Sequence, residues 1–126
     1  MSKPLILYLK KNTYEETVLF EGEAKEPILE DSITNYEFID VVFNDYRGKN
    51  SQRIYNPSVN MEFTHIAGSY DGWIYIRICQ YILLDRQIKL NNSPNVTLQG
   101  ENGTTLRFST DSIRNISKVI GYKKGA

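Results

Sequence analysis

The feature that most constrains the fold is an alternation of side chains over residues 73–82. Isoleucines occupy one side of this stretch, and aromatic or polar side chains occupy the other: Ile74, Ile76, Ile78 and Ile82 against Trp73, Tyr75, Arg77, Cys79 and Tyr81. Successive side chains of a β-strand point to opposite faces, whereas a helix would scatter these isoleucines around its circumference. We therefore predict a long strand, with the isoleucines facing the core.

The rest of the chain repeats this preference for strands. It contains 14 Ile and 9 Tyr but only 3 Ala, a balance that favours a pleated surface over a helix. Further predicted strands are Leu5–Leu9, Glu16–Glu21, Pro27–Leu29, Tyr36–Phe43, Arg53–Tyr55, Val59–Ile66, Val96–Gln99, Thr104–Phe108 and Ile116–Tyr122. With roughly eight to ten strands and a turn about every 8–12 residues, the expected fold is one all-β domain over residues 1–126, an antiparallel β-sandwich that is jelly-roll-like or related.

The net charge and the hydropathy of the chain exclude two classes of binding partner, nucleic acids and the membrane interior. Lys and Arg total 15 and Asp and Glu total 15, so the chain lacks the positive excess that nucleic-acid binding requires. No apolar stretch approaches the ~18–20 residues that span a membrane, and we expect no membrane insertion. The first residues do not form a signal peptide, and a single cysteine excludes an internal disulfide. We therefore expect synthesis and folding in a reducing compartment.

Catalytic and metal-binding patterns are weak. His65 and Cys79 are the only residues of their kinds, whereas nucleophilic triads and zinc sites need several such groups together. We interpret Cys79 as a packed thiol and His65 as a surface or capping residue that ends a strand. Carboxylates such as Asp40 and Asp85 are assigned to turns and solvated faces. The expectation is a protein that is not an enzyme and needs no cofactor and no metal.

Two groups of residues are candidates for binding. Trp73, Tyr75 and Tyr81 share one face of the long strand, next to Tyr70. This face can be the inner side of a second sheet, a contact between subunits, or a platform for sugar rings. Leu5, Leu7 and Leu9 lie in the second candidate, residues 1–16, which we interpret as a strand or arm that docks onto a neighbouring protein.

Three segments in order resemble a domain of tail and baseplate proteins in phages of Gram-positive bacteria and in phage-derived tail-like elements. They are Val18–Gly22, then Ile28–Phe43 followed by Tyr55-Asn56-Pro57, and finally Ile116–Lys123 with its Lys-Val-Ile-Gly-Tyr sequence. The resemblance covers residues 18–123, and it is loosest over residues 59–92. It implies a β-sandwich that forms a structural or receptor-contacting part of the tail tip in several copies, and it brings no catalytic residues.

The sequence therefore predicts a non-catalytic tail or baseplate protein that resides in the virion tail or a tail-like particle. The expected partners are further copies of the chain, other tail or baseplate proteins, and a cell-wall carbohydrate of the host. The alternative is a free-standing carbohydrate-binding module, in which the same aromatic side chains would bind sugar without any particle.

Overall fold

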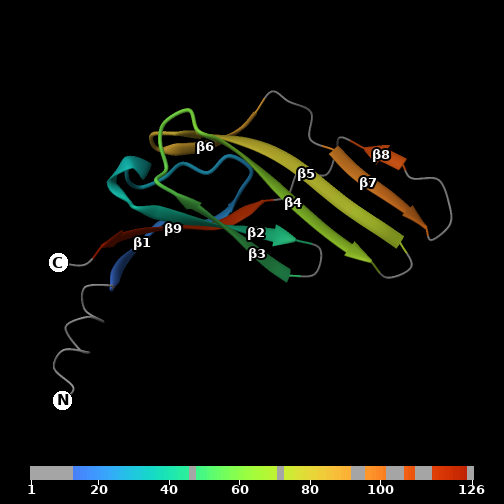
Figure 1. Cartoon of the computed structure of the whole chain (residues 1–126), viewed down its shortest axis with the longest axis horizontal. Coiled ribbons are helices and arrows are strands. Elements are labelled where there is room, and N and C mark those ends of the chain that lie inside the picture. Colours follow the sequence, from blue (N-terminus) through green and yellow to red (C-terminus); the bar gives the residue numbers. More distant parts are fainter. Residues whose placement is uncertain are drawn as a thin grey trace, which may run out of the picture.

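The computed structural model describes residues 13–45, 48–70, 73–91, 96–101, 107–109 and 115–124 (Figure 1). For residues 45, 48, 67–70, 73–77, 96–101 and 107–109, this description is of the backbone alone. The elements in chain order are β1 (Tyr14–Ala24), η1 (Ile33–Asn35, a 3₁₀ helix), β2 (Phe38–Asp45), β3 (Gly48–Tyr55), β4 (Glu62–Tyr70), β5 (Trp73–Leu84), β6 (Gln87–Leu90), β7 (Val96–Glu101), β8 (Arg107–Ser109) and β9 (Ile116–Lys124).

The strands form two antiparallel sheets that face each other, so the predicted all-β sandwich is confirmed. The first sheet has the order β1-β9-β2-β3. The second has the order β4-β5-β7-β8, with β6 paired to the end of β5. In Figure 1, β4 and β5 run past the first sheet, and β7 and β8 lie beside their far ends. No helix in the described part of the chain is long and apolar enough to cross a membrane.

The core lies between the first sheet and the β5–β6 part of the second. The predicted alternation of β2 is confirmed, since Ile39, Val41 and Phe43 are fully buried on its inner face. Other fully buried side chains come from β1, η1, β5, β6 and β9: Leu19, Ile33, Tyr81, Leu83, Ile88, Ile116 and Val119. Burial of such side chains, at about 1.5–3 kcal/mol each, holds the two layers together.

A β-bulge in β1 directs two consecutive side chains into this core. Val18 pairs with Ile120 and Phe20 pairs with Val119, which leaves Leu19 as the extra residue. Two residues of a bulged strand oppose one residue of its partner. Leu19 is fully buried and Phe20 packs against the same core cluster, so the regular alternation that a flat strand would impose is broken here.

The faces of β5 are opposite to our prediction where its side chains are described. Cys79, Tyr81 and Leu83 are buried, whereas Ile78 and Ile82 are only half-buried on the other face. Both faces of this strand are apolar, so the alternation identified the strand without deciding which side meets the first sheet. The Tyr81 ring packs against Phe43 and Phe63, and this aromatic packing determines which face of β5 meets the first sheet.

Other predicted strand boundaries also need correction. β4 begins at Glu62 and continues to Tyr70, so Val59 lies in the preceding turn and is 46% exposed. In the predicted strand Pro27–Leu29, a single bridge joins Ile28 to Gln87. The predicted strand Leu5–Leu9 lies outside the described residues.

Backbone hydrogen bonds close one side of the sandwich, and a side chain bridges the other. The Leu29 N–H donates to the Arg86 carbonyl at 2.8 Å, and the Glu30 N–H donates to the Leu19 carbonyl at 2.8 Å. On the opposite side, the Gln52 amide of β3 donates to the Thr64 carbonyl of β4 at 3.1 Å. The edges of the two sheets are thus tied together near the core.

Candidate binding surface

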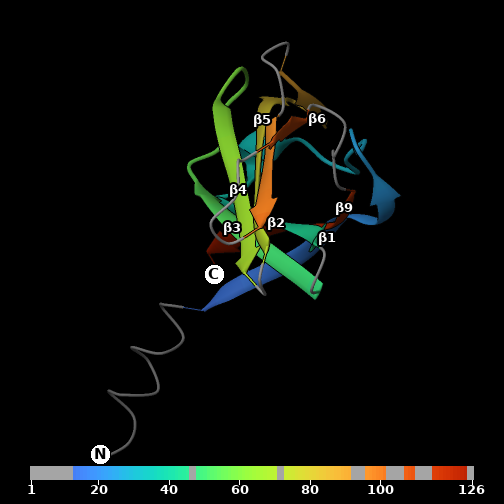
Figure 2. The ribbon, with the colours of Figure 1, turned by 90° about the vertical axis from the view of Figure 1, so that its right-hand side faces the viewer.

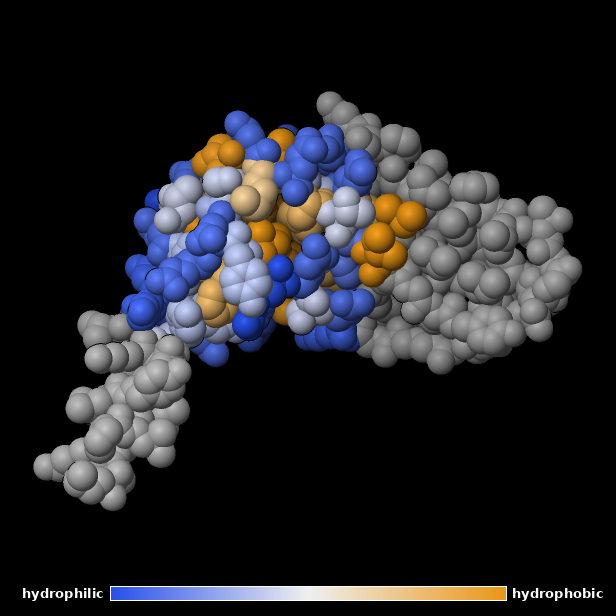
Figure 3. Space-filling model, viewed as in Figure 1, coloured by the Kyte–Doolittle hydropathy of each residue, from blue (hydrophilic) through white to orange (hydrophobic). Residues whose placement is uncertain are grey.

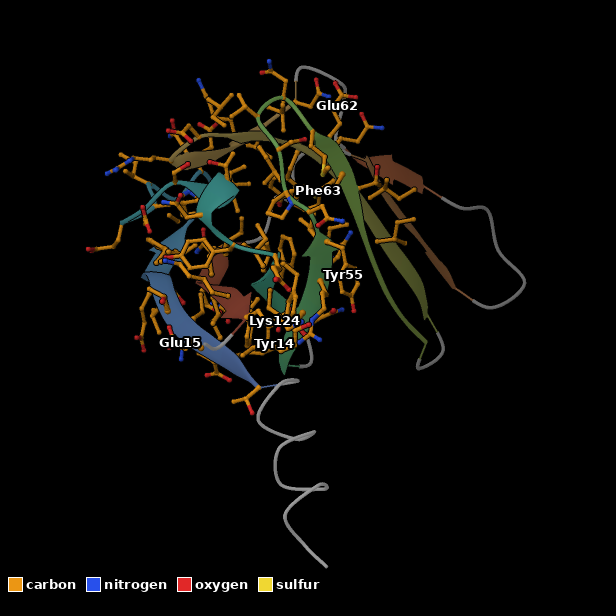
Figure 4. The ribbon with its side chains drawn as sticks, turned by 60° about the vertical axis from the view of Figure 1, so that its left-hand side comes forward. Tyr14, Glu15, Tyr55, Glu62, Phe63 and Lys124 are labelled. Atoms are coloured by element: carbon orange, nitrogen blue, oxygen red, sulfur yellow. The ribbon has the colours of Figure 1, made fainter. Side chains whose placement is uncertain are left out.

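The outer face of the first sheet carries four aromatic rings, one from each strand. We call Tyr14, Phe38, Tyr55 and Tyr122 the outer aromatic cluster. The Phe38 ring is central: it stacks on Tyr122 at 4.6 Å between centroids, meets Tyr14 edge-on at 4.9 Å, and lies 5.6 Å from Tyr55. Figure 4 labels Tyr14 and Tyr55 at the two ends of this row.

Strand register explains why these rings meet. Phe38 lies opposite Tyr122 on β9 and opposite Tyr55 on β3, so the three residues form one line across the sheet. Directly opposite side chains in antiparallel strands have Cβ atoms about 4.5–5.5 Å apart, within reach of aromatic contact. Tyr14 joins them diagonally, because Lys124 faces it on β9. The row is therefore set by the backbone rather than by flexible loops.

An ion pair lies beside the cluster. The Arg53 guanidinium donates from Nε and Nη2 to the two oxygens of Asp40, at 2.8 and 2.9 Å. The same guanidinium lies 4.4 Å from the Phe38 ring centroid and 5.4 Å from that of Tyr122. Two hydrogen bonds and a ring contact hold it in one orientation.

The short distances between Asp40, Arg53 and Tyr122 contribute to shifts in the pKa values of all three side chains. Hydrogen bonds from Arg53 hold the pKa of Asp40 below its ordinary value, and they raise the pKa of Arg53 in return. Burial raises the pKa of Tyr122, and the neighbouring Asp40 carboxylate adds to that shift. The Asp40 carboxylate is thus held in its ionised form, in which it accepts both hydrogen bonds from Arg53.

The cluster is covered at its centre and open at its ends. Phe38 is only 6% exposed, whereas Tyr14 is 40% and Tyr55 is 63% exposed. Seen from the side drawn in Figure 3, the described surface is mainly hydrophilic with separate hydrophobic spots. Isolated exposed apolar side chains are normal on a folded domain, but a fixed row of rings with an arginine is typical of protein-binding sites.

A close contact on the inner side of the same sheet supports this region. A Cβ atom added at Gly121 would lie 2.5 Å from the nearest Tyr36 ring atom, so the ring packs directly on the glycine backbone. The Tyr36 hydroxyl donates to Asp31 at 2.8 Å, and the Lys123 ammonium lies 5.3 Å from the ring centroid. Gly121 and Tyr122 of the terminal motif thus serve opposite faces: one receives Tyr36 and the other stacks on Phe38.

Tyr81 is not available for binding. It is fully buried, and its ring stacks on Phe63 at 5.2 Å and lies 5.6 Å from Phe43. The prediction of a subunit or sugar contact is wrong for this residue, and the alternative that it lines the inner side of a sheet is confirmed. The strand faces the first sheet on this side, so the ring fills the core.

The other predicted binding residues are untested by the structure. The backbone places Trp73 and Tyr75 on β5 and Tyr70 at the end of β4, but their side chains are outside the description. Leu5, Leu7 and Leu9 lie outside the described residues altogether. Their proposed roles in binding and docking stay predictions.

His65 is a core residue, which corrects the surface role predicted for it. It lies within β4, is 3% exposed, and stacks on Phe43 with 3.7 Å between ring centroids. Its Nδ1 atom is 3.4 Å from the Gln52 side-chain oxygen. The flat ring fills the space above Phe43 as an aromatic residue would. The predicted burial of Cys79 is confirmed at 1% exposure.

The carboxylates have mixed surroundings. Asp85 lies in the β5–β6 turn as predicted, and Ser32 donates to it. Asp40 lies within β2, in the predicted strand Tyr36–Phe43, and its side chain is 16% exposed in the ion pair with Arg53. Within the described residues, no three His, Cys, Asp or Glu side chains are grouped to hold a metal ion.

Sequence reasoning missed the outer aromatic cluster, although a signal was present. In β2 the buried positions are Ile39, Val41 and Phe43, so Phe38 falls on the face expected to be polar. Tyr55 is likewise out of phase with Ile54 in β3. A large ring on the solvent side of an amphipathic strand is the pattern that predicts such a surface.

Comparison with protein-family models found no match, and comparison with curated proteins found none either.

Proposed function

We propose that this protein is a non-catalytic structural subunit of a phage-type tail or baseplate and works by assembling in several copies. One observation carries the proposal: part of each segment that resembles tail and baseplate proteins lies in the first sheet. Val18–Gly22 lies in β1, Phe38–Phe43 in β2, Tyr55 ends β3, and Ile116–Lys123 lies in β9. These parts of the segments are therefore neighbours in one sheet, which supports the proposal.

The outer aromatic cluster is the contact that we assign to neighbouring subunits of the particle. Interface hot spots are enriched in tyrosine and arginine, and they lie in well-packed surroundings that exclude water. Tyr14 and Tyr55 supply exposed rings, and Arg53 supplies a charged group fixed by Asp40. A partner that covers the cluster would reduce the screening of this ion pair by water, which raises the Coulombic attraction and is opposed by the loss of hydration of both charges.

Host-surface contact through a carbohydrate is the second candidate, and the same surface favours it. The cluster has two exposed tyrosine rings that can stack on sugar rings, and the Arg53 guanidinium over Phe38 can donate to sugar hydroxyls. Under this alternative, the protein is a carbohydrate-binding module, and a purified monomer would bind saccharide without any tail partner.

The test uses Tyr55→Ala, because this side chain is 63% exposed and its removal leaves the core intact. Ile28→Ala is the matched control, since Ile28 is 72% exposed and its backbone pairs with Gln87 of β6, not with a strand that carries the cluster. Each variant is co-expressed with tail and baseplate subunits of the same particle, and the mass of the purified complex is measured. We expect Tyr55→Ala to lose the complex and Ile28→Ala to keep it.

Titration of the same variants with soluble host cell-wall saccharides separates the two functions. Saccharide binding by the wild-type protein, lost in Tyr55→Ala and without any complex with tail subunits, would replace the tail proposal by the carbohydrate-binding one. A monomer that binds neither would refute both.

A further inference from the structure

The N-terminal half of β1 is an edge that extends beyond the core. All five residues Tyr14–Val18 are exposed, although a strand in a sandwich normally buries every second side chain. β1 is the terminal strand of its sheet, and Figure 2 shows it running out at the margin of the molecule toward the N-terminal end. At Leu19 the edge is covered, because Glu30 donates to the Leu19 carbonyl. The open part is therefore short and well defined.

This edge has a charge pattern that selects its partner. β1 contains four glutamates, Glu15, Glu16, Glu21 and Glu23, and no cationic residue. The residues that precede it, 1–12, contain Lys3, Lys10 and Lys11 and no acidic residue. Opposite charges on facing strands stabilise a ladder and like charges destabilise it, so residues 1–12 are complementary to β1.

We infer that two copies of the chain pair through this edge, with residues 8–12 of each copy added as a strand to Tyr14–Val18 of the other. The inference names the first partner in the proposed assembly and in that sense rests on the proposed function. One antiparallel register places the lysines opposite the glutamates: Lys10 faces Glu16 and Lys11 faces Glu15. The other pairs in this register are Tyr8 with Val18, Leu9 with Thr17 and Asn12 with Tyr14. This register makes four ion pairs per dimer.

Geometry requires that this pairing occurs between two copies. Within one chain, only Thr13 would separate Asn12 from Tyr14, whereas a β-hairpin loop needs at least about two residues. Between two copies the same register has two-fold symmetry, because the segment 8–18 of one copy runs antiparallel to the segment 8–18 of the other. The two-fold axis then passes between the two Thr13 residues, and each copy gives and receives the same contact, as a two-fold interface demands.

A direct pairing of two β1 edges without residues 8–12 is the competing arrangement. Centred on the open residues Tyr14–Val18, it would place Glu16 of one copy opposite Glu16 of the other, which is repulsive. The pairing through residues 8–12 avoids this repulsion and covers an edge that would otherwise be open to unspecific strand addition.

A disulfide at the two-fold axis tests the register. Directly opposite residues have Cα atoms about 4.5–5.5 Å apart, within the range that a disulfide bridges. In a Cys79→Ala background, which removes the native thiol, Thr13→Cys should give a covalent dimer under mild oxidation. Thr17→Cys is the matched control, because Thr17 would face Leu9, and it should stay monomeric on a non-reducing gel. A cross-link through Glu16→Cys instead of Thr13→Cys would overturn the inference in favour of direct β1 pairing.

Charge reversal tests the partner without relying on a cross-link. Glu15→Lys/Glu16→Lys and Lys10→Glu/Lys11→Glu should each raise the dissociation constant of the dimer about 100-fold, since four attractions become repulsions. An equimolar mixture of these two variants should restore a heterodimer, because every lysine then again faces a glutamate. Native mass spectrometry distinguishes the heterodimer from either homodimer. No heterodimer in the mixture would overturn the inference.

The outcome is separable from that of the proposed function. A chain that forms no dimer by either test but joins tail subunits through Tyr55 refutes the edge pairing alone. A dimer that passes both tests but joins no tail subunit refutes the tail function and leaves the pairing intact.

Discussion

The two faces of the first sheet differ in what their side chains contact. The inner face of its central strands is mostly aliphatic, with Ile39, Val41, Ile116 and Val119 fully buried against the second sheet. The outer face of the same strands carries aromatic rings and the Arg53–Asp40 ion pair. The inner side chains are what the fold requires. The outer rings are more than the fold requires, which is why we assign them to binding.

The two faces of the first sheet should also differ in how far they tolerate side-chain truncation. The inner face is packed at the density of a protein interior, where loss of a ring leaves a cavity. At the outer face, water can fill the place of an exposed ring. Truncation of rings on the two faces should therefore have very different effects on stability, and the following predictions run from the largest effect to the smallest.

Phe43→Ala should have the largest effect. The Phe43 ring is fully buried and contacts both His65 and Tyr81, so its removal leaves a cavity between the sheets. We expect the free energy of unfolding to fall by about 3–5 kcal/mol, a large part of the ~5–15 kcal/mol that stabilises a typical domain. Urea denaturation followed by tryptophan fluorescence measures this. A loss below ~1 kcal/mol would show that the core is not centred on this ring.

Gly121→Ala should have an intermediate effect. The added methyl group would lie 2.5 Å from the Tyr36 ring, so the ring or the strand must shift. Overpacking of this kind costs about 1–3 kcal/mol. In a Tyr36→Ala background the methyl group has room, and the same substitution should then cost less. Equal costs in the two backgrounds, measured by a double-mutant cycle, would disprove the contact.

Asp40→Asn should change the pH dependence of stability by a small amount. The native pKa of Asp40 lies below its ordinary value of 3.8 because Arg53 donates to its carboxylate. This contribution to stability is fully present above pH 3.8 and is lost as the pH falls through the lowered native pKa. An ion pair at a partly exposed site contributes about 0.2–1 kcal/mol. The difference between wild type and Asp40→Asn in urea denaturation should therefore shrink below that pH. A difference that does not change with pH would contradict the role of the ion pair.

Tyr55→Ala should have the smallest effect on stability, within about 0.5 kcal/mol, as for most exposed positions. Its ring is 63% exposed and lies at the end of the outer aromatic cluster. The comparison of faces would fail if this variant unfolded as readily as Phe43→Ala under the same urea gradient.

Sequence reasoning predicted the all-β class and the inner face of β2. In this strand every second residue, such as Ile39 and Val41, is apolar because it is buried, and that pattern can be seen in the sequence. It failed at β5, where both faces are apolar and only the partner ring of Phe43 decides which one is buried. It also missed the cluster, since the rings of Phe38, Tyr55 and Tyr122 meet only through strand pairing over long separations. Local periodicity can place a ring such as Phe38 on the solvent side of its strand, but it does not say which rings of other strands lie next to it.

The position of β9 determines when this protein can fold during synthesis. Although it is the last strand in the chain, it lies between β1 and β2, and it pairs residues as distant as Tyr14 and Lys124. While the chain is still on the ribosome, β1 and β2 therefore have their shared neighbour missing and their inner edges open. Long-range pairing of this kind slows folding. It also leaves strand edges unpaired for longer, so that they can pair with other chains. The first sheet can therefore close only after β9 has left the ribosome, whatever the order in which the other strands emerge.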